Sequence, residues 1–163
     1  MKKSITVILS VLFLANHVFG QTGLGFQAVE NSGQITIVGY TGNEKNLIIP
    51  GTANGFPIVA IGDEAFRDKQ LTSVTIGNSV TTIGNSAFTN NRLTSVIIPD
   101  SVTTIGEMAF TGNRLTSVTI GANVRIDSGA FDDSFLSAYN GVAGTYIRPS
   151  ASSSRWTKGI FTF

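Results

Sequence analysis

The stretch LTSVTIGNSVTTIGNSAFTNNR, from Leu71 to Arg92, is followed at once by LTSVIIPDSVTTIGEMAFTGNR, from Leu93 to Arg114. A third copy begins with LTSVTIGANV at Leu115, so the leading Leu, Val and Ile return every 22 residues. A period in the twenties headed by L-x-x-V-x-I is typical of a leucine-rich solenoid, in which each repeat forms one coil. One such coil buries too little apolar surface to fold alone, and stacking the coils supplies the missing contacts.

Each copy is expected to begin with a short strand. Side chains alternate between the two faces of a strand, so Val74 and Ile76 point inward and Thr75 points outward. The return half of the coil is expected to bury four further side chains, which are Val80, Ile83, Ala87 and Phe88. Gly84 and its equivalents Gly62 and Gly106 predict either a positive φ angle or a close backbone approach. The segments RDKQ, TNNR and TGNR predict polar turns between coils.

A more divergent copy precedes these three, and the last copy ends at Phe131. Leu47-Ile48-Ile49-Pro50 matches Val96 to Pro99, and Ile61 to Phe66 matches Ile83 to Phe88, with five extra residues between the halves. We assign residues 44–135 to the repeat region, which includes the four residues after Phe131. Strand-like runs around Asn31-Ser32-Gly33 predict a hairpin cap in residues 21–43. Residues 136–163 are expected to form a C-terminal cap or tail, with strands at 145–148 and 155–163.

The predicted fold is therefore mostly β. It is a short right-handed leucine-rich-repeat solenoid of about four coils, with an N-terminal β-hairpin cap and a C-terminal β cap.

Residues 1–20, MKKSITVILSVLFLANHVFG, have the three-part pattern of a secretory signal peptide. Lys2 and Lys3 precede an apolar run that is shorter than the roughly 20 residues of a membrane span. We expect cleavage before Gln21 and a secreted or cell-surface protein. The processed chain is expected to have no membrane span.

Cleavage leaves nine basic and ten acidic residues, so the formal net charge falls from +1 to −1. A nucleic-acid partner is not expected, because no basic stripe is present to neutralise phosphates. The processed chain also contains no His and no Cys, since the one His is His17. Ser–His or Cys–His nucleophiles and the usual ligands of zinc or copper are thus missing. We expect no enzymatic activity, no cofactor and no metal, and the enzymatic alternative is a protein that uses only carboxylates and hydroxyls.

The most complete copy, Leu93 to Phe110, reads L-x-x-V-x-I-P-x-S-V-x-x-I-G-x-x-A-F. It resembles the BspA-like leucine-rich repeat of bacterial surface antigens, and the resemblance spans roughly Glu44 to Phe131. It implies an exported, non-enzymatic protein. Members of the family are associated with adhesion to extracellular-matrix proteins such as fibronectin and fibrinogen, with binding to other cells, and with recognition by innate immune receptors. The motif consists of structural positions, so the resemblance supplies no binding residues.

The candidate ligand face is the outward side of the strand ladder. Its members are small hydroxyl residues and two isoleucines, namely Ile48, Ser73, Thr75, Ser95, Ile97, Ser117 and Thr119. The alternative is a solvated sheet face on which β-branched residues simply favour strand. Other features have two interpretations as well. The acidic pairs Asp63-Glu64 and Asp132-Asp133 could bind calcium or form solvated turns. The repeated residues Arg92 and Arg114 could recognise an acidic group or lie along the coil as turn residues. Trp156 could anchor a partner or cover the last coil.

We therefore expect an adhesin-like module that binds protein ligands, such as a matrix glycoprotein or a host-cell receptor. The alternative is a structural or self-assembling module of the cell envelope, with the chain associating with copies of itself.

Overall fold

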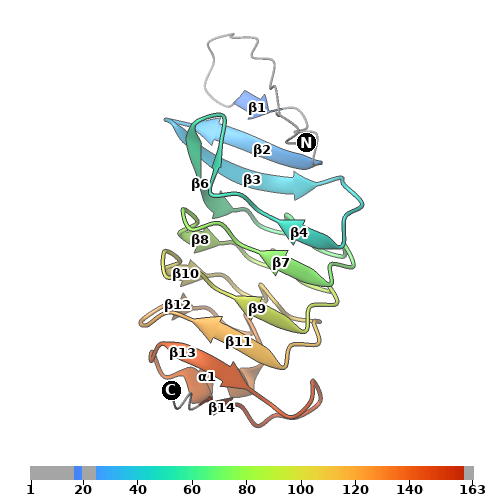
Figure 1. The fold of residues 1–163 in the computed structure, drawn as a ribbon, viewed down its shortest axis with the longest axis vertical. Coiled ribbons are helices and arrows are strands. Elements are labelled where there is room, and N and C mark those ends of the chain that lie inside the picture. Colours follow the sequence, from blue (N-terminus) through green and yellow to red (C-terminus); the bar gives the residue numbers. More distant parts are fainter. Residues whose placement is uncertain (1–16, 20–24, 160–163) are drawn as a thin grey trace, which may run out of the picture.

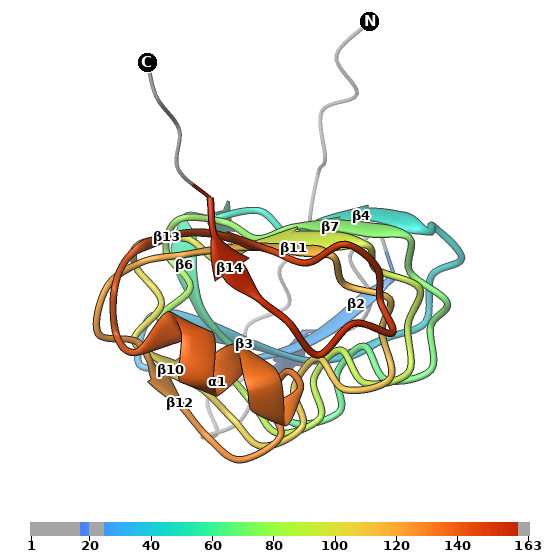
Figure 2. The same cartoon turned by 90° about the horizontal axis from the view of Figure 1, so that it is seen from below.

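The repeats wind into a solenoid with β-strands along two opposite sides, as seen in the computed structural model, which describes residues 17–19 and 25–159 (Figure 1). Each coil contributes one strand to each side. Viewed along the solenoid axis, successive coils superimpose (Figure 2). The predicted solenoid of about four coils is confirmed.

One side carries a sheet in the order β1-β2-β3-β6-β8-β10-β12. Strands β3 to β12 of this order run parallel, and β2 is antiparallel to β3. The strands are β1 (His17–Phe19), β2 (Phe26–Asn31), β3 (Gln34–Tyr40), β6 (Phe56–Ile61), β8 (Thr82–Ile83), β10 (Thr104–Ile105) and β12 (Arg125–Ile126).

The opposite side carries the strands at the head of each repeat. Here β4 (Asn46–Ile48) pairs parallel with β7 (Ser73–Thr75), and β9 (Ser95–Ile97) pairs parallel with β11 (Ser117–Ile120). Two antiparallel strands continue this side beyond the repeats, β13 (Gly144–Ile147) on β11 and β14 (Thr157–Lys158) on β13.

The interior is filled as the repeat predicts. Val74 and Ile76 are buried and Thr75 between them is exposed. The predicted return residues are also buried, and these are Val80, Ile83, Ala87 and Phe88. Equivalent phenylalanines stack along the axis, with ring centroids 5.1 Å apart from Phe66 to Phe88 and 5.2 Å apart from Phe88 to Phe110. Phe131 continues the stack. Each ring therefore packs against the coil above and the coil below.

The polar segments between coils do more than turn the chain. Asn91 is buried, and its Nδ2 donates to the carbonyl oxygens of Phe66 and Phe88 at 2.8 and 2.9 Å. Its Oδ1 accepts from the backbone N–H of Leu71 at 2.9 Å. Asn113 repeats these contacts one coil later. The prediction of a simple polar turn was therefore incomplete, because these asparagines satisfy buried backbone groups of neighbouring coils.

Gly84 is required by a close approach. A Cβ at this position would lie 2.5 Å from Asp63 Oδ1 and 2.7 Å from Asp63 N, closer than real Cβ atoms come to a neighbour. The positive φ falls two residues later, at Ser86 with φ of 53°. Of the two explanations offered by the sequence, the close approach is the correct one.

The N-terminal end is covered by the predicted hairpin of β2 and β3. Ser32 and Gly33 form its turn with φ of 53° and 79°. The rings of Phe26 and Tyr40 lie 6.0 and 5.7 Å from the ring of Phe66, so the hairpin closes the phenylalanine stack. The five extra residues of the first coil form a second small hairpin, in which β5 (Thr52–Ala53) pairs antiparallel with β6.

The predicted signal peptide lies mostly outside the described residues. Its described part is β1, whose backbone pairs antiparallel with β2 from His17 opposite Glu30 to Phe19 opposite Ala28. Among residues 17–19 and 25–159 there is no helix with the length and apolar character of a membrane span.

The C-terminal end contains a helix in addition to the strands of the predicted β cap. A helix, α1 (Asp133–Tyr139), follows the last coil directly, and the sequence did not predict it. Its Phe135 ring lies 4.5 Å from Phe131 and ends the phenylalanine stack. The predicted strand at 145–148 corresponds to β13. The predicted final strand is limited to the two residues of β14 within the described chain.

Candidate binding face

The strand face is the outer surface of β4, β7, β9, β11 and β13, and its residues are aligned by strand register. Ile48 lies opposite Thr75, and Ile97 lies opposite Thr119. Ser95 lies opposite Ser117 in the adjacent row. Figure 1 shows these strands stacked on one side of the solenoid. All seven residues predicted for the ligand face therefore lie on strands of this one side.

The two isoleucines are the most exposed large apolar side chains of the described chain, at 68% for Ile48 and 67% for Ile97. Ser73, Thr75 and Ser95 are exposed, and Ser117 and Thr119 are half-buried. The hydroxyl groups of Thr75 and Ser95 make no hydrogen bond to a described residue. They are free to donate to a partner and to accept from it.

Sequence reasoning missed that the face continues onto β13. Thr145 lies opposite Thr119, and their hydroxyl oxygens are 2.8 Å apart. Ile147 lies opposite Ser117 and is exposed, which adds a third isoleucine to the face. The strand-like run at 145–148 was visible in the sequence. Its antiparallel pairing with β11 could not be predicted, because the 22-residue period aligns only the strands that belong to the repeats.

Among the seven predicted residues there is no acid, base or metal ligand. Across residues 17–19 and 25–159, no group of three or more His, Asp or Glu side chains is placed to hold a metal ion. The face can therefore contact a partner through apolar surface and hydroxyl hydrogen bonds, which is the chemistry of binding.

Three of the four acidic residues that the sequence offered as calcium ligands have other contacts. Asp63 Oδ1 accepts from the backbone N–H of Asn85 at 2.7 Å, and Glu64 pairs with Arg67 at 2.6 Å. Asp132 caps α1 by accepting from the backbone N–H of Phe135 at 3.0 Å.

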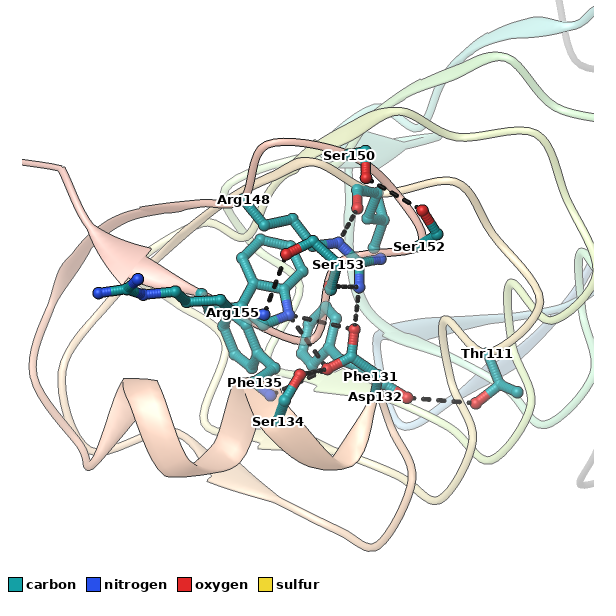
Figure 3. A network of polar contacts seen from close by, with 12 residues as sticks. Thr111, Phe131, Asp132, Ser134, Phe135, Arg148, Ser150, Ser152, Ser153 and Arg155 are labelled. Carbon is teal, nitrogen blue, oxygen red and sulfur yellow. Dashed lines mark hydrogen bonds and ion pairs between the residues drawn. The ribbon is translucent and has the colours of Figure 1, made fainter.

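Asp132 is also the centre of a polar network that locks the C-terminal cap (Figure 3). Its carboxylate accepts from Arg148 Nη1 at 2.5 Å and from the Trp156 indole N–H at 3.0 Å. The Arg148 guanidinium lies over the Trp156 ring, 4.5 Å from its centroid. Trp156 is buried against Phe135 with ring centroids 5.2 Å apart. Of the two roles considered for Trp156, the structure shows the cover over the last coil.

A small half-open cleft of roughly 120 Å³ lies beside this network. Its walls include Leu115, Arg148 and Trp156. Sites for drug-sized ligands enclose about 300–1,000 Å³. The cleft is too small for such a ligand, and the strand face remains the main candidate surface.

Burial raises the pKa of the Tyr146 phenol above its ordinary value, and the neighbouring Tyr139 raises it further. The Tyr146 hydroxyl donates to the carbonyl oxygens of Val142 and Tyr139 at 2.5 and 3.1 Å. Above about pH 10 the unfolded chain releases this proton while the folded chain keeps it, so the free energy of unfolding falls as the pH rises. Below the unfolded pKa the contribution is fully present.

We expect urea midpoints measured from about pH 8.5 to 11 to decline more steeply for the wild type than for Tyr146→Phe. The variant is less stable at neutral pH because it lacks the hydroxyl. Parallel declines in the two proteins would contradict the role of this phenol.

Comparison with known proteins identifies the repeat. The family model described as a BspA type leucine rich repeat region matches residues 43–149, in six copies. A leucine-rich repeat protein of T. pallidum is 24% identical, with 67% of this chain and 64% of that chain aligned at a TM-score of 0.51. This likeness shows a shared fold. The chain spans less than two thirds of that protein.

A leucine rich cell surface protein from Faecalibacterium prausnitzii is 25% identical, with 73% of this chain and 52% of that chain aligned at a TM-score of 0.40. A search of curated proteins gave no match.

Proposed function

The chain belongs to the BspA-type leucine-rich repeat family, and from this we propose that it is an exported, non-enzymatic module that binds protein ligands through the strand face. Leucine-rich repeats of this kind are protein-interaction modules. The more specific part of the proposal is an adhesin-like role toward extracellular-matrix or host-cell proteins. Export rests on the sequence pattern of residues 1–20.

The observation that carries the proposal is the exposure of Ile48 and Ile97 at equivalent positions of their repeats, on strands of one side of the solenoid. An isoleucine that is two-thirds exposed contributes little to folding stability, whereas a partner that covers it gains apolar burial. Thr75 lies opposite Ile48 and Thr119 lies opposite Ile97, so a hydroxyl group accompanies each isoleucine.

The size of the face predicts weak individual contacts. Five strands at about 4.8 Å and three residues at about 3.3 Å give a surface of roughly 200–300 Å². Stable protein interfaces bury about 800 Å² on each partner. Useful adhesion therefore requires several copies acting together, since linked weak contacts gain affinity through effective concentration.

We expect Ile97→Asp to abolish binding to immobilised fibronectin or fibrinogen when the protein is displayed in multiple copies. The substitution puts a charge where apolar contact is proposed, and it leaves stability nearly unchanged because the position is exposed. Surface plasmon resonance of residues 21–163, as a monomer and on a multivalent scaffold, measures the effect.

Val38→Asp is the matched control, because Val38 is an exposed β-branched residue of β3 in the opposite sheet. Loss of binding in both variants would point to general disturbance rather than to the strand face. Absence of wild-type binding in both formats would remove the matrix-adhesin role.

The pairing of β1 with β2 favours self-association as a second function. Cleavage before Gln21 would remove β1 and leave one edge of the six-residue strand β2 without a partner. An open strand edge is a template for pairing with another chain. Light scattering of residues 21–163 tests this function, and a monomer at all concentrations would count against it.

A further inference from the structure

Positively charged residues lie along one margin of the strand face. Arg92 and Arg114 each occur three residues before the first residue of their strands, β9 and β11. Arg92 N–H donates to Leu71 O at 2.8 Å, and Arg114 N–H donates to Leu93 O at 2.9 Å. The two arginines are equivalent residues of adjacent coils, and each bonds to the leading leucine of the preceding coil, so they stack about 4.8 Å apart along the solenoid axis.

Lys45 extends this row toward the N-terminal end. It comes directly before β4, and its Nζ donates to the carbonyl oxygen of Lys69 at 2.9 Å, which holds the ammonium group against the turn of the next coil. We call Lys45, Lys69, Arg92 and Arg114 the cationic margin. It borders the ends at which the parallel strands begin.

The cationic margin makes no ion pair within the described chain, although Glu44 directly precedes Lys45 and Asp68 directly precedes Lys69. The ion pairs of the described chain involve Arg67, Arg125 and Arg148, and none involves a residue of the margin. Both Arg92 and Arg114 are exposed, and neither guanidinium makes a hydrogen bond to a described residue. Both guanidinium groups are therefore accessible to a partner.

The opposite margin of the strand face carries a negative charge. Asp100 follows β9 by three residues and is exposed. The strand face is thus uncharged along its middle, positive where its strands begin and negative where β9 ends. Such a distribution favours one orientation of a charged partner over the reverse, since like charges brought together are unfavourable.

We propose that the partner of the strand face presents an extended acidic segment to the cationic margin. This inference rests on the proposed function and adds the charge of its protein ligand. Carboxylates suit the two arginines because a guanidinium can bind a carboxylate through two parallel hydrogen bonds. Same-side residues of an extended segment are about 6.6 Å apart, a spacing that two flexible arginine side chains in adjacent coils can span.

The test uses a fluorescent peptide of about ten residues, with alternating Glu and Thr, long enough at about 3.3 Å per residue to follow the margin. Fluorescence polarisation with the multivalent protein is measured at low salt and at about 0.15 M salt. We expect Arg92→Gln/Arg114→Gln to weaken binding about tenfold, because exposed charge pairs contribute up to about fivefold each. We also expect weaker wild-type binding at the higher salt concentration.

Two controls isolate the charge of the margin. The same peptide with Gln in place of Glu is expected not to bind, and Arg125→Gln, on β12 of the opposite sheet, is expected to leave binding unchanged. Equal binding of the Glu and Gln peptides, or an unaffected double variant, would overturn the inference. Binding of a sulfated polysaccharide without binding of the Glu peptide would also overturn it, since the margin would then recognise a glycan.

Comparing binding to matrix protein with binding to the Glu peptide tests the proposed function and this inference separately. If Ile97→Asp abolishes binding to matrix protein while the double arginine variant retains it, the strand face functions and the acidic-segment inference is wrong. If the Glu peptide binds and no matrix protein does, the margin recognises acidic segments and the adhesive role is wrong.

Discussion

Phe88→Ala is expected to lower the free energy of unfolding by about 3–5 kcal/mol, the usual range for a buried phenylalanine. Phe88 is fully buried, and its ring stacks on Phe66 at 5.1 Å and on Phe110 at 5.2 Å. Its loss therefore opens a cavity shared by three coils. Natural domains are stable by about 5–15 kcal/mol, so this single change removes a large part of the total.

Urea unfolding followed by circular dichroism measures the effect. Phe56→Ala is the control, because Phe56 is the same residue type but is exposed on β6, and we expect a loss below about 1 kcal/mol. A Phe88→Ala protein as stable as the Phe56→Ala protein would show that the stack contributes little. Phe88→Leu is expected to lie between them, since it fills part of the cavity.

Asn91→Ala is expected to cost about 3–5 kcal/mol, which is unusual for the loss of a neutral polar side chain. Asn91 is 4% exposed, and its amide satisfies the Leu71 N–H and the carbonyl oxygens of Phe66 and Phe88. Removing it leaves the Leu71 N–H and the Phe66 carbonyl oxygen without a partner, at about 1–3 kcal/mol for each group, whereas the Phe88 carbonyl oxygen keeps its hydrogen bond from Asn113.

Asn91→Asp separates hydrogen bonding from packing. The aspartate has nearly the same shape and keeps an acceptor for Leu71 N–H, but its carboxylate cannot donate to the two carbonyl oxygens. We expect it to be at least as destabilising as the alanine at neutral pH. Asn78→Ala, at an exposed asparagine without a hydrogen bond to a described residue, is expected to change stability by less than about 0.5 kcal/mol. A mild effect at Asn91 would mean that water replaces the amide.

The repeat predicted the fold well because its residues have the same surroundings in every coil. Val74, Ile83 and Phe88 are buried as their alternation and spacing required. The same regularity predicted that all seven candidate residues share one side of the solenoid. The 22-residue period alone aligns the six of them on β7, β9 and β11, whereas Ile48 lies opposite Thr75 across the five-residue insertion of the first copy.

The ends and the polar ladders were harder to predict because they depend on contacts outside the repeat. Helix α1 has seven residues and depends on Asp132, which looked like part of an acidic turn. In the sequence, Asn91 has the character of a turn residue. Its recurrence as Asn113 indicated that both side chains make the same hydrogen bonds in successive coils. The cationic margin could be recognised only in the structure. The spacing of its residues in the sequence does not show that their side chains are exposed or that they make no ion pair.

Trp156 is the single tryptophan of the chain, and its place in the C-terminal cap makes it an optical reporter of that end. The Trp156 indole packs on Phe135 and donates a hydrogen bond to Asp132. Its fluorescence emission therefore changes when the C-terminal cap opens, even if the distant coils stay folded. Circular dichroism instead averages over all coils. Comparing the two signals during unfolding reveals whether the array frays from this end. Exchanging Tyr40 for a tryptophan in a Trp156→Phe background would place the reporter at the other end.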